Sequence, residues 1–150
     1  MSLKESLSHD LKAAMKQRDE KLKVSVIRLL KAAIQYEEKD KRRELSDEEV
    51  IEVTAREIKK RQESIPDYQR AGREETVKQL NEEIEFLRTY LPQQLTEEEI
   101  RSLIVKAIKD TGAQGTKDMG KVMKVVITQT RGRADGKLVN NLVKQLLVTD

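Results

Sequence analysis

Hydrophobic residues recur every three or four positions along most of the chain, a spacing that is typical of amphipathic helices. Near the C-terminus, for example, Leu138, Val139, Leu142, Val143 and Leu146 follow this period. No segment alternates hydrophobic and polar residues over five or more positions with the β-branched and aromatic enrichment of a half-buried strand. The sequence therefore predicts an all-α protein with helices at about 3–17, 21–41, 46–65, 74–91, 96–111, 119–130 and 135–147.

Short local motifs predict where helices begin and where one domain ends. The pattern Ser/Thr-x-x-Glu is typical of a capping box, in which two side chains satisfy backbone N–H groups at a helix N-terminus. It occurs at Ser2–Glu5, Ser46–Glu49 and Thr96–Glu99. Pro66 and Gly72 interrupt the third helical pattern, although Pro66 is also compatible with a helix that continues. Leu91 precedes Pro92 and therefore disfavours the α conformation, so we expect an N-terminal helical domain at 1–92 and a C-terminal three-helix domain at 93–150.

Composition narrows the class of protein. The chain contains no cysteine, which excludes disulfides, thiolate metal ligands and cysteine nucleophiles. No apolar run approaches the roughly 20 residues of a membrane span, and the first residues lack the apolar stretch of a signal peptide. We therefore expect a soluble cytoplasmic protein that does not insert into membranes.

Charge is distributed unevenly along the chain. Residues 1–92 contain 20 basic and 20 acidic side chains, whereas residues 111–150 contain seven basic and three acidic ones. A neutral body with one basic end is typical of a protein that meets an anion. The candidate nucleic-acid contacts are Lys117, Lys121, Lys124, Arg131, Arg133, Lys137, Asn140, Asn141 and Lys144, and Met119 and Gly120 are candidates for close approach of a ligand. The alternative is that these residues are ordinary solvated side chains, since 38% of the whole chain is charged.

Other chemical motifs are weak. The segment GTKDMGKV, which begins at Gly115, approximates a phosphate-binding loop, but Val122 replaces the hydroxyl residue that would hold Mg²⁺. His9 is the single histidine and is expected to lie on the surface of the first helix. The acidic clusters look like helix N-terminal residues rather than catalytic pairs. We therefore predict no catalytic residues, no cofactor and no metal site.

An ordered set of motifs resembles a known family. The segments YLPQQLTEEEI, DMGKVMKVV and GRADGKLVNNLVKQLL, together with the N-terminal MSLKESLSHDLKAAMKQRDEKLKVSVIRLLKAAI, resemble the YqeY-like family. The C-terminal part also resembles the GatB/YqeY tail domain of the B subunit of tRNA-dependent amidotransferase. The family pattern usually has proline after "AD", where this chain has Gly136.

The resemblance implies a helical, two-part fold and a C-terminal module that, in the amidotransferase, helps to hold the tRNA. It also implies a family label of carbon–nitrogen ligase with glutamine as amido-N-donor, although this chain lacks the amidase nucleophile region and the kinase-like cradle domain. Our first hypothesis is a tRNA- or RNA-binding accessory protein without catalysis of its own. The second is a component that acts with amidotransferase subunits on misacylated tRNA.

A third hypothesis is a protein-interaction module that uses an apolar seam on the fourth helix. The seam consists of Val77, Leu80, Ile84, Leu87 and Leu91, at spacings of three and four residues. An exposed seam would make the chain dimerise, whereas a seam packed within the chain favours a monomer. We expect the monomer.

Overall fold

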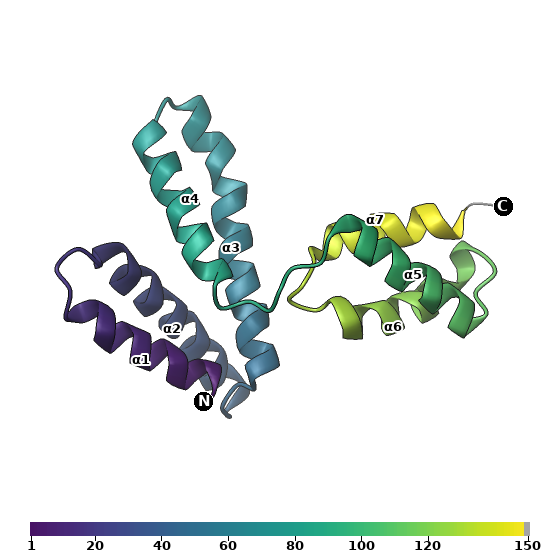
Figure 1. Ribbon diagram of the computed structural model, residues 1–150, viewed down its shortest axis with the longest axis horizontal. Coiled ribbons are helices and arrows are strands. Elements are labelled where there is room, and N and C mark those ends of the chain that lie inside the picture. Colours follow the sequence, from purple (N-terminus) through teal and green to yellow (C-terminus); the bar gives the residue numbers. More distant parts are fainter. Residues whose placement is uncertain (149–150) are drawn as a thin grey trace. The chain divides into compact units, whose positions relative to one another are not determined.

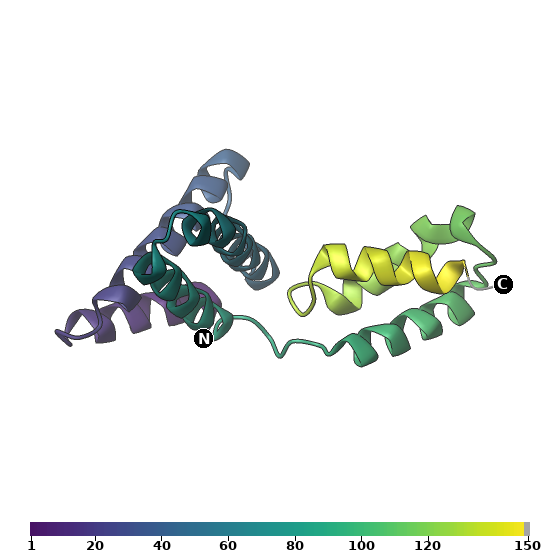
Figure 2. The ribbon, with the colours of Figure 1, turned by 90° about the horizontal axis from the view of Figure 1, so that it is seen from above.

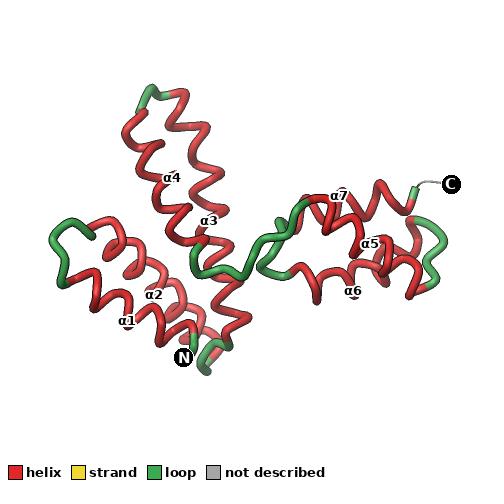
Figure 3. The backbone as a smooth tube through the Cα atoms, in the orientation of Figure 1, coloured by secondary structure: helices red, strands yellow, loops and turns green. Residues whose placement is uncertain are grey.

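The secondary structure of residues 1–148, the part of the chain that the computed structural model describes, is entirely helical (Figure 3). The helices are α1 (Leu3–Met15), α2 (Lys21–Lys41), α3 (Asp47–Arg70), α4 (Glu74–Arg88), α5 (Glu97–Thr111), the 3₁₀ turn η1 (Thr116–Asp118), α6 (Met119–Thr130) and α7 (Gly136–Leu147). The all-α prediction is confirmed. Over the same residues, no helix combines the length and the apolar composition that crossing a membrane requires.

The chain divides into two compact units, Met1–Leu91 and the residues from Pro92 onward. Each unit has its own hydrophobic core, and no buried residue of one core belongs to the other. Independent folding of domains at 1–92 and 93–150 stays a prediction.

The N-terminal unit consists of two antiparallel helical hairpins, α1–α2 and α3–α4 (Figures 1 and 2). Helix α2 packs on both α3 and α4, and α1 also packs on α3. Amphipathic periodicity determines which face of each helix is buried. On α2, for example, Val26, Ile27, Leu30 and Ile34 follow a helical spacing and are all buried. The largest buried side chains of the unit are leucine and isoleucine, because the chain has few aromatic residues.

Three of the helices begin at the Ser and Thr residues that the sequence indicates, but the reciprocal capping box forms only at α1. There the Ser2 side chain accepts a hydrogen bond from the Glu5 N–H, and the Glu5 carboxylate accepts one from the Ser2 N–H. At α3 the Ser46 side chain caps the helix, but the Glu49 carboxylate binds Arg43 and Lys41 instead. The prediction of a full box was wrong there because competing cations lie within reach.

Helix α3 continues through Pro66 and ends at Arg70, as the alternative of a helix that continues past the proline predicts. Its turn into α4 is made at Gly72, whose φ of +71° lies in the left-handed region that favours glycine. The apolar seam of α4 packs inside this hairpin: Ile84 and Leu87 are buried, and Val77, Leu80 and Leu91 are partly buried. An interaction module built on this seam therefore has no exposed seam to use.

Glu38 on α2 accepts two hydrogen bonds on the same carboxylate oxygen, from Lys4 Nζ at 2.6 Å and from the Leu45 N–H at 2.8 Å. The bond from Lys4, with that from Leu45, holds the pKa of Glu38 below its usual value. The pKa of Lys4 is raised, chiefly by its hydrogen bond to Glu38. The pair therefore stabilises the fold above the unfolded pKa of Glu38, and this contribution is lost as the pH falls through the lower folded pKa.

We expect Glu38→Gln to lower the free energy of unfolding by about 1–2 kcal/mol at neutral pH, because a charge-assisted hydrogen bond is lost. The difference in Tm between the wild type and Glu38→Gln should shrink as the pH is lowered below about 4.5, the ordinary value for Glu. Thermal unfolding followed by circular dichroism between about pH 3 and 7 measures this. Glu44→Gln is the control, because Glu44 also faces Lys4 but its side chain is 90% exposed. A difference in Tm between the wild type and Glu38→Gln that stays constant over this pH range would contradict the prediction.

Candidate nucleic-acid interface

The turn between α6 and α7 contains both candidate arginines, Arg131 and Arg133. Helix α6 ends at Thr130, whose hydroxyl donates to the Val126 carbonyl and is buried. The Thr130 carbonyl accepts hydrogen bonds from the N–H groups of Arg133 at 2.8 Å and Ala134 at 3.1 Å. Gly132 lies between Arg131 and Arg133 and has a φ of +73°, which explains why glycine is needed in this turn.

Three hydrogen bonds connect this turn to the segment that precedes α5. The Leu95 N–H donates to the Arg133 carbonyl at 2.8 Å, and Gln94 Nε2 donates to the Gly132 carbonyl at 2.8 Å. Arg133 Nε in turn donates to the Gln93 carbonyl at 3.1 Å. Arg133 is therefore partly buried and holds the turn in place with one of its donors. Arg131 is exposed.

Helix α6 presents one basic face. Lys121 and Lys124 are exposed, whereas Val122 and Val126 on the opposite face are completely buried. The two lysines lie three residues apart, which places them about 60° from each other around the helix axis. Lys117 is also exposed and lies in η1, one turn before them along the chain. We refer to Lys117, Lys121 and Lys124 as the α6 row.

Helix α7 presents a second basic face. Lys137, Asn141 and Lys144 are exposed and lie at positions i, i+4 and i+7, which share one side of a helix. We refer to these three residues as the α7 row. Asn140 is partly buried at the edge of this face, so the two adjacent asparagines differ in exposure.

The nearest acidic residues in sequence are engaged by backbone groups. The Asp118 carboxylate accepts from the Gln114 N–H at 2.9 Å, and the Asp135 carboxylate accepts from the Lys137 N–H at 3.4 Å. Among the described residues of the C-terminal unit, the lysines of both rows form no salt bridge with a carboxylate. The third acidic residue of this region, Asp150, lies outside the described residues. Ion pairs with the described acidic residues of this unit therefore do not compensate the positive charge of the two rows.

Met119 and Gly120 differ in what surrounds them. Met119 is partly buried and packs on the C-terminal core. Gly120 is exposed, and a Cβ atom added to it would meet nothing within 4 Å. No packing within the chain therefore requires glycine at position 120, whereas glycine at 112 is required by a φ of +68°.

Gly136 is the first residue of α7, a position where proline is favoured because the N–H has no partner within the helix. The preceding residue, Asp135, has φ −68° and ψ 127°, an extended conformation that tolerates a following proline. We expect Gly136→Pro to raise the free energy of unfolding by about 0.5–1 kcal/mol, because it restricts the unfolded chain. Urea unfolding measures this. Gly136→Ala should give a smaller gain, and a loss of stability in the proline variant would contradict the prediction.

The structure thus places the candidate residues in two rows on two helices and in one hydrogen-bonded turn. The link between residues 93–95 and the turn is the feature that sequence reasoning missed, since no local pattern predicts a contact across about 38 residues. Leu138 follows the hydrophobic period of the last helix but is 36% exposed, and Ile127 of α6 is 38% exposed, because each lies at the edge of its apolar face.

These observations define an all-helical protein whose C-terminal unit exposes basic side chains on two helices. A family model described as "Yqey-like protein" matches residues 4–147, and the chain belongs to this family, as its motifs predict. A comparison with curated proteins found no match.

Proposed function

We propose that the protein binds structured RNA through phosphate contacts made by the α6 row and the α7 row, and that tRNA is its RNA class. The observation that carries the proposal is that five exposed lysines of one small unit form no salt bridge with the described residues of that unit. When exposed, unpaired lysine side chains contact phosphates, they release the counterions that are condensed on the nucleic acid, which favours binding. The resemblance of this unit to the tail domain of the amidotransferase B subunit supports tRNA.

The absence of aromatic residues from positions 93–148 favours recognition of the sugar–phosphate backbone over stacking on single-stranded bases. With roughly four phosphate contacts, the affinity for duplex RNA should fall with salt with a log–log slope of about −3 to −4. The proposal assigns no catalytic step to this chain.

The test is fluorescence anisotropy with a labelled tRNA over a series of salt concentrations. Lys121→Glu/Lys124→Glu removes two cations from the α6 row, and Lys137→Glu/Lys144→Glu removes two from the α7 row. Each double variant should weaken binding at least tenfold and reduce the slope by about 2, since each lost phosphate contact contributes about 0.9. The matched control is Lys106→Glu/Lys109→Glu, which reverses two exposed lysines of α5 at the same spacing of three residues.

The control should keep the slope of the wild type, because its charge change is identical but lies on another helix. If all three double variants weaken binding equally, the effect is one of net charge and the proposed surface is wrong. If the wild type does not bind tRNA at low salt, the function itself is wrong.

Gly120 provides an independent test of close approach. Gly120→Leu fits the open space around position 120, and it removes a helix-destabilising glycine, so the fold should be retained or stabilised. If RNA approaches the backbone beside Lys121, the added side chain should weaken tRNA binding while the Tm stays the same or rises. Unchanged binding would remove Gly120 from the interface and leave the two rows to be judged by their own variants.

A further inference from the structure

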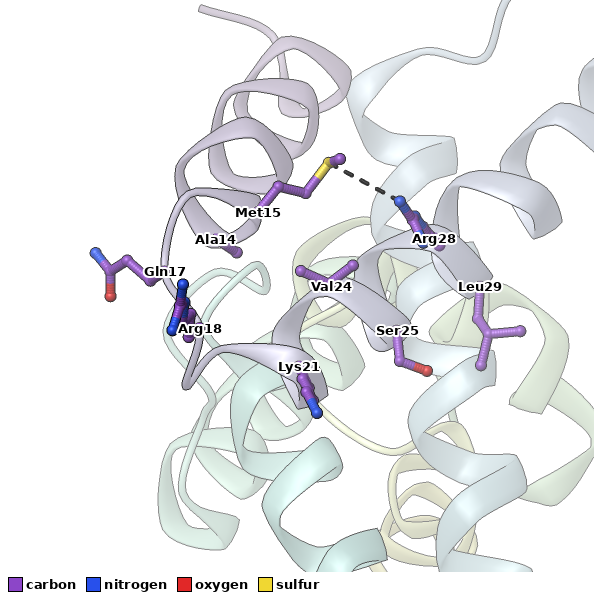
Figure 4. Close-up of a pocket in the computed structure, with 9 residues that line it drawn as sticks. All are labelled: Ala14, Met15, Gln17, Arg18, Lys21, Val24, Ser25, Arg28 and Leu29. Atoms are coloured by element: carbon purple, nitrogen blue, oxygen red, sulfur yellow. Dashed lines mark hydrogen bonds between the residues drawn. The ribbon is translucent and has the colours of Figure 1, made fainter.

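A hollow of about 560 Å³ lies in the N-terminal unit, where the end of α1 turns into α2 (Figure 4). Its apolar surface is formed by Ala14, Met15, Val24 and Leu29. Met15 and Leu29 are 57% and 55% exposed, and they line the same hollow instead of lying singly on the surface. The hollow is therefore an apolar surface that the chain itself leaves uncovered.

Three cations surround this apolar surface. Arg18, Lys21 and Arg28 line the hollow, all three are exposed, and no acidic residue lines it within the described part of the chain. Figure 4 shows Met15 and Arg28 pointing toward each other across the hollow, with Arg28 Nη2 at 3.9 Å from the Met15 sulfur. This contact is weak, because thioether sulfur is a poor acceptor. The three cations form no salt bridge with the described residues of the N-terminal unit, and Glu20 in the adjoining turn is already paired with Lys23 at 2.8 Å.

The apolar surface continues along α2 as an exposed stripe. Leu29, Ala32 and Tyr36, with the polar Ser25 at the start of the stripe, lie at spacings of four, three and four residues, and all four are exposed. Because Val26, Ile27, Leu30 and Ile34 are buried on the other side, α2 has two apolar faces. The stripe extends over about 16 Å, or three helical turns. Tyr36, at its far end, is 78% exposed.

We propose that this surface, the hollow together with the α2 stripe, binds an acidic amphipathic helix of a partner protein. The spacing of the stripe matches the i, i+4, i+7, i+11 pattern with which a helix presents its apolar residues to a groove. The cations around the hollow select acidic side chains beside that apolar face. Carboxylates limit this positive rim. Glu75 and Glu82 of α4 line a neighbouring hollow together with Lys21 and Ser25, and Glu37 and Asp40 line another with Tyr36, so the preference for acidic side chains is confined to the hollow between α1 and α2.

A second copy of this chain and an RNA are two other molecules that could cover this surface, and each fits it less well. A symmetric dimer whose two-fold axis passes through the hollow would bring the three cations of one copy against the same three cations of the other, which is repulsive. An RNA backbone would leave Met15, Leu29 and Tyr36 exposed, because phosphates and sugars do not cover apolar side chains as a helix does. This interaction is independent of the proposed RNA binding, which uses other residues.

The test uses the full chain and a dye-labelled 15-residue helical peptide that has Leu at positions i, i+4, i+7 and i+11 and Glu at the flanking positions. A twin peptide with Lys in place of Glu is the charge control. Anisotropy should show the acidic peptide binding with a Kd below about 1 mM and at least tenfold more tightly than its twin. Leu29→Glu should weaken this binding more than tenfold, and Lys21→Glu/Arg28→Glu should remove the preference for the acidic peptide.

Val105→Glu is the matched control for Leu29→Glu, because Val105 on α5 is 54% exposed and carries the same change. It should leave peptide binding unchanged, and circular dichroism should show both variants folded. The proposal is overturned if the acidic peptide does not bind, or if the two glutamate variants have equal effects. It is also overturned if Leu29→Glu converts a concentration-dependent dimer to a monomer, or if Lys21→Glu/Arg28→Glu abolishes tRNA binding, since a second copy or RNA would then occupy the surface.

Discussion

Ile104→Ala is expected to lower the free energy of unfolding of the C-terminal unit by about 3–4 kcal/mol, because it opens a cavity in a close-packed core. Ile104 on α5 has no exposed surface and lies among Val122, Val126, Val139 and Val143 of the other two helices. A unit of this length has a total stability of only about 3–9 kcal/mol at the usual value per residue. The substitution should therefore remove a large share of it.

The cavity should affect one unit because the two cores share no buried residue. We expect amide hydrogen exchange to accelerate in peptides from residues 97–147 and to stay unchanged in peptides from residues 22–58. Leu30→Ala, at a position 1% exposed in the N-terminal core, should give the reverse pattern. Val105→Ala is the control for both, since it changes an exposed residue next to Ile104 and should alter stability by less than about 0.5 kcal/mol.

A different result would be equally informative. If Ile104→Ala accelerates exchange throughout the chain to the same extent, the chain unfolds as one cooperative unit. The prediction of separately folding domains at 1–92 and 93–150 would then be wrong, even though the buried residues form two clusters.

The helices could be predicted from sequence because the signals that start and orient them are local. Ser46 and Thr96 cap their helices through N–H groups only three residues away, so a short motif is sufficient to locate each start. The fate of the Glu49 carboxylate could not be predicted in the same way. Two partners compete for it, and the outcome depends on how the chain between α2 and α3 places Arg43 and Lys41.

The exposure of the candidate lysines of α6 also follows from the helical period. Lys121 and Lys124 lie on one side of the helix, and the buried Val122 and Val126 lie on the other. Sequence reasoning failed where a side chain has a tertiary partner. Nothing in the turn indicated the hydrogen bond from Arg133 Nε to the Gln93 carbonyl, and the role of Arg133 as a phosphate ligand stays a prediction. The exposed apolar stripe of α2 was also missed. Leu29 and Tyr36 are interspersed in sequence with Val26, Ile27, Leu30 and Ile34, so a pattern of hydrophobic positions alone does not separate the exposed stripe from the buried face.

The buried ion pair of the α3–α4 hairpin provides the second large expected effect. Arg61 Nε lies 3.1 Å from Glu83 Oε1, and the two side chains are only 11% and 12% exposed. Arg61 Nη1 also donates to the Glu57 carbonyl at 3.0 Å, and Gln79 Nε2 donates to Glu83 at 3.4 Å. Both charges are thus removed from most of the solvent. Glu83 is the closer carboxylate partner of Arg61, and the Glu57 carboxylate lies farther from it, at 3.5 Å from Nη1.

We expect Glu83→Ala to lower the free energy of unfolding by about 2–4 kcal/mol, since it leaves the Arg61 charge poorly solvated and without its main partner. The double variant Arg61→Met/Glu83→Leu should recover most of this loss, because apolar residues of similar volume need no compensation in a buried site. Urea unfolding followed at 222 nm measures all variants. Arg88→Ala is the control, because its pair with Glu85 is exposed on both sides and should contribute less than about 1 kcal/mol.

The order of the three stabilities separates two physical explanations. If the pair acts through uncompensated charge, the single variant is the least stable and the double variant lies close to the wild type. If the hairpin instead needs the pair as a specific link between α3 and α4, the double variant should be as unstable as Glu83→Ala or more so. That second order would show that the ion pair itself, rather than the avoidance of a lone buried charge, holds the two helices together.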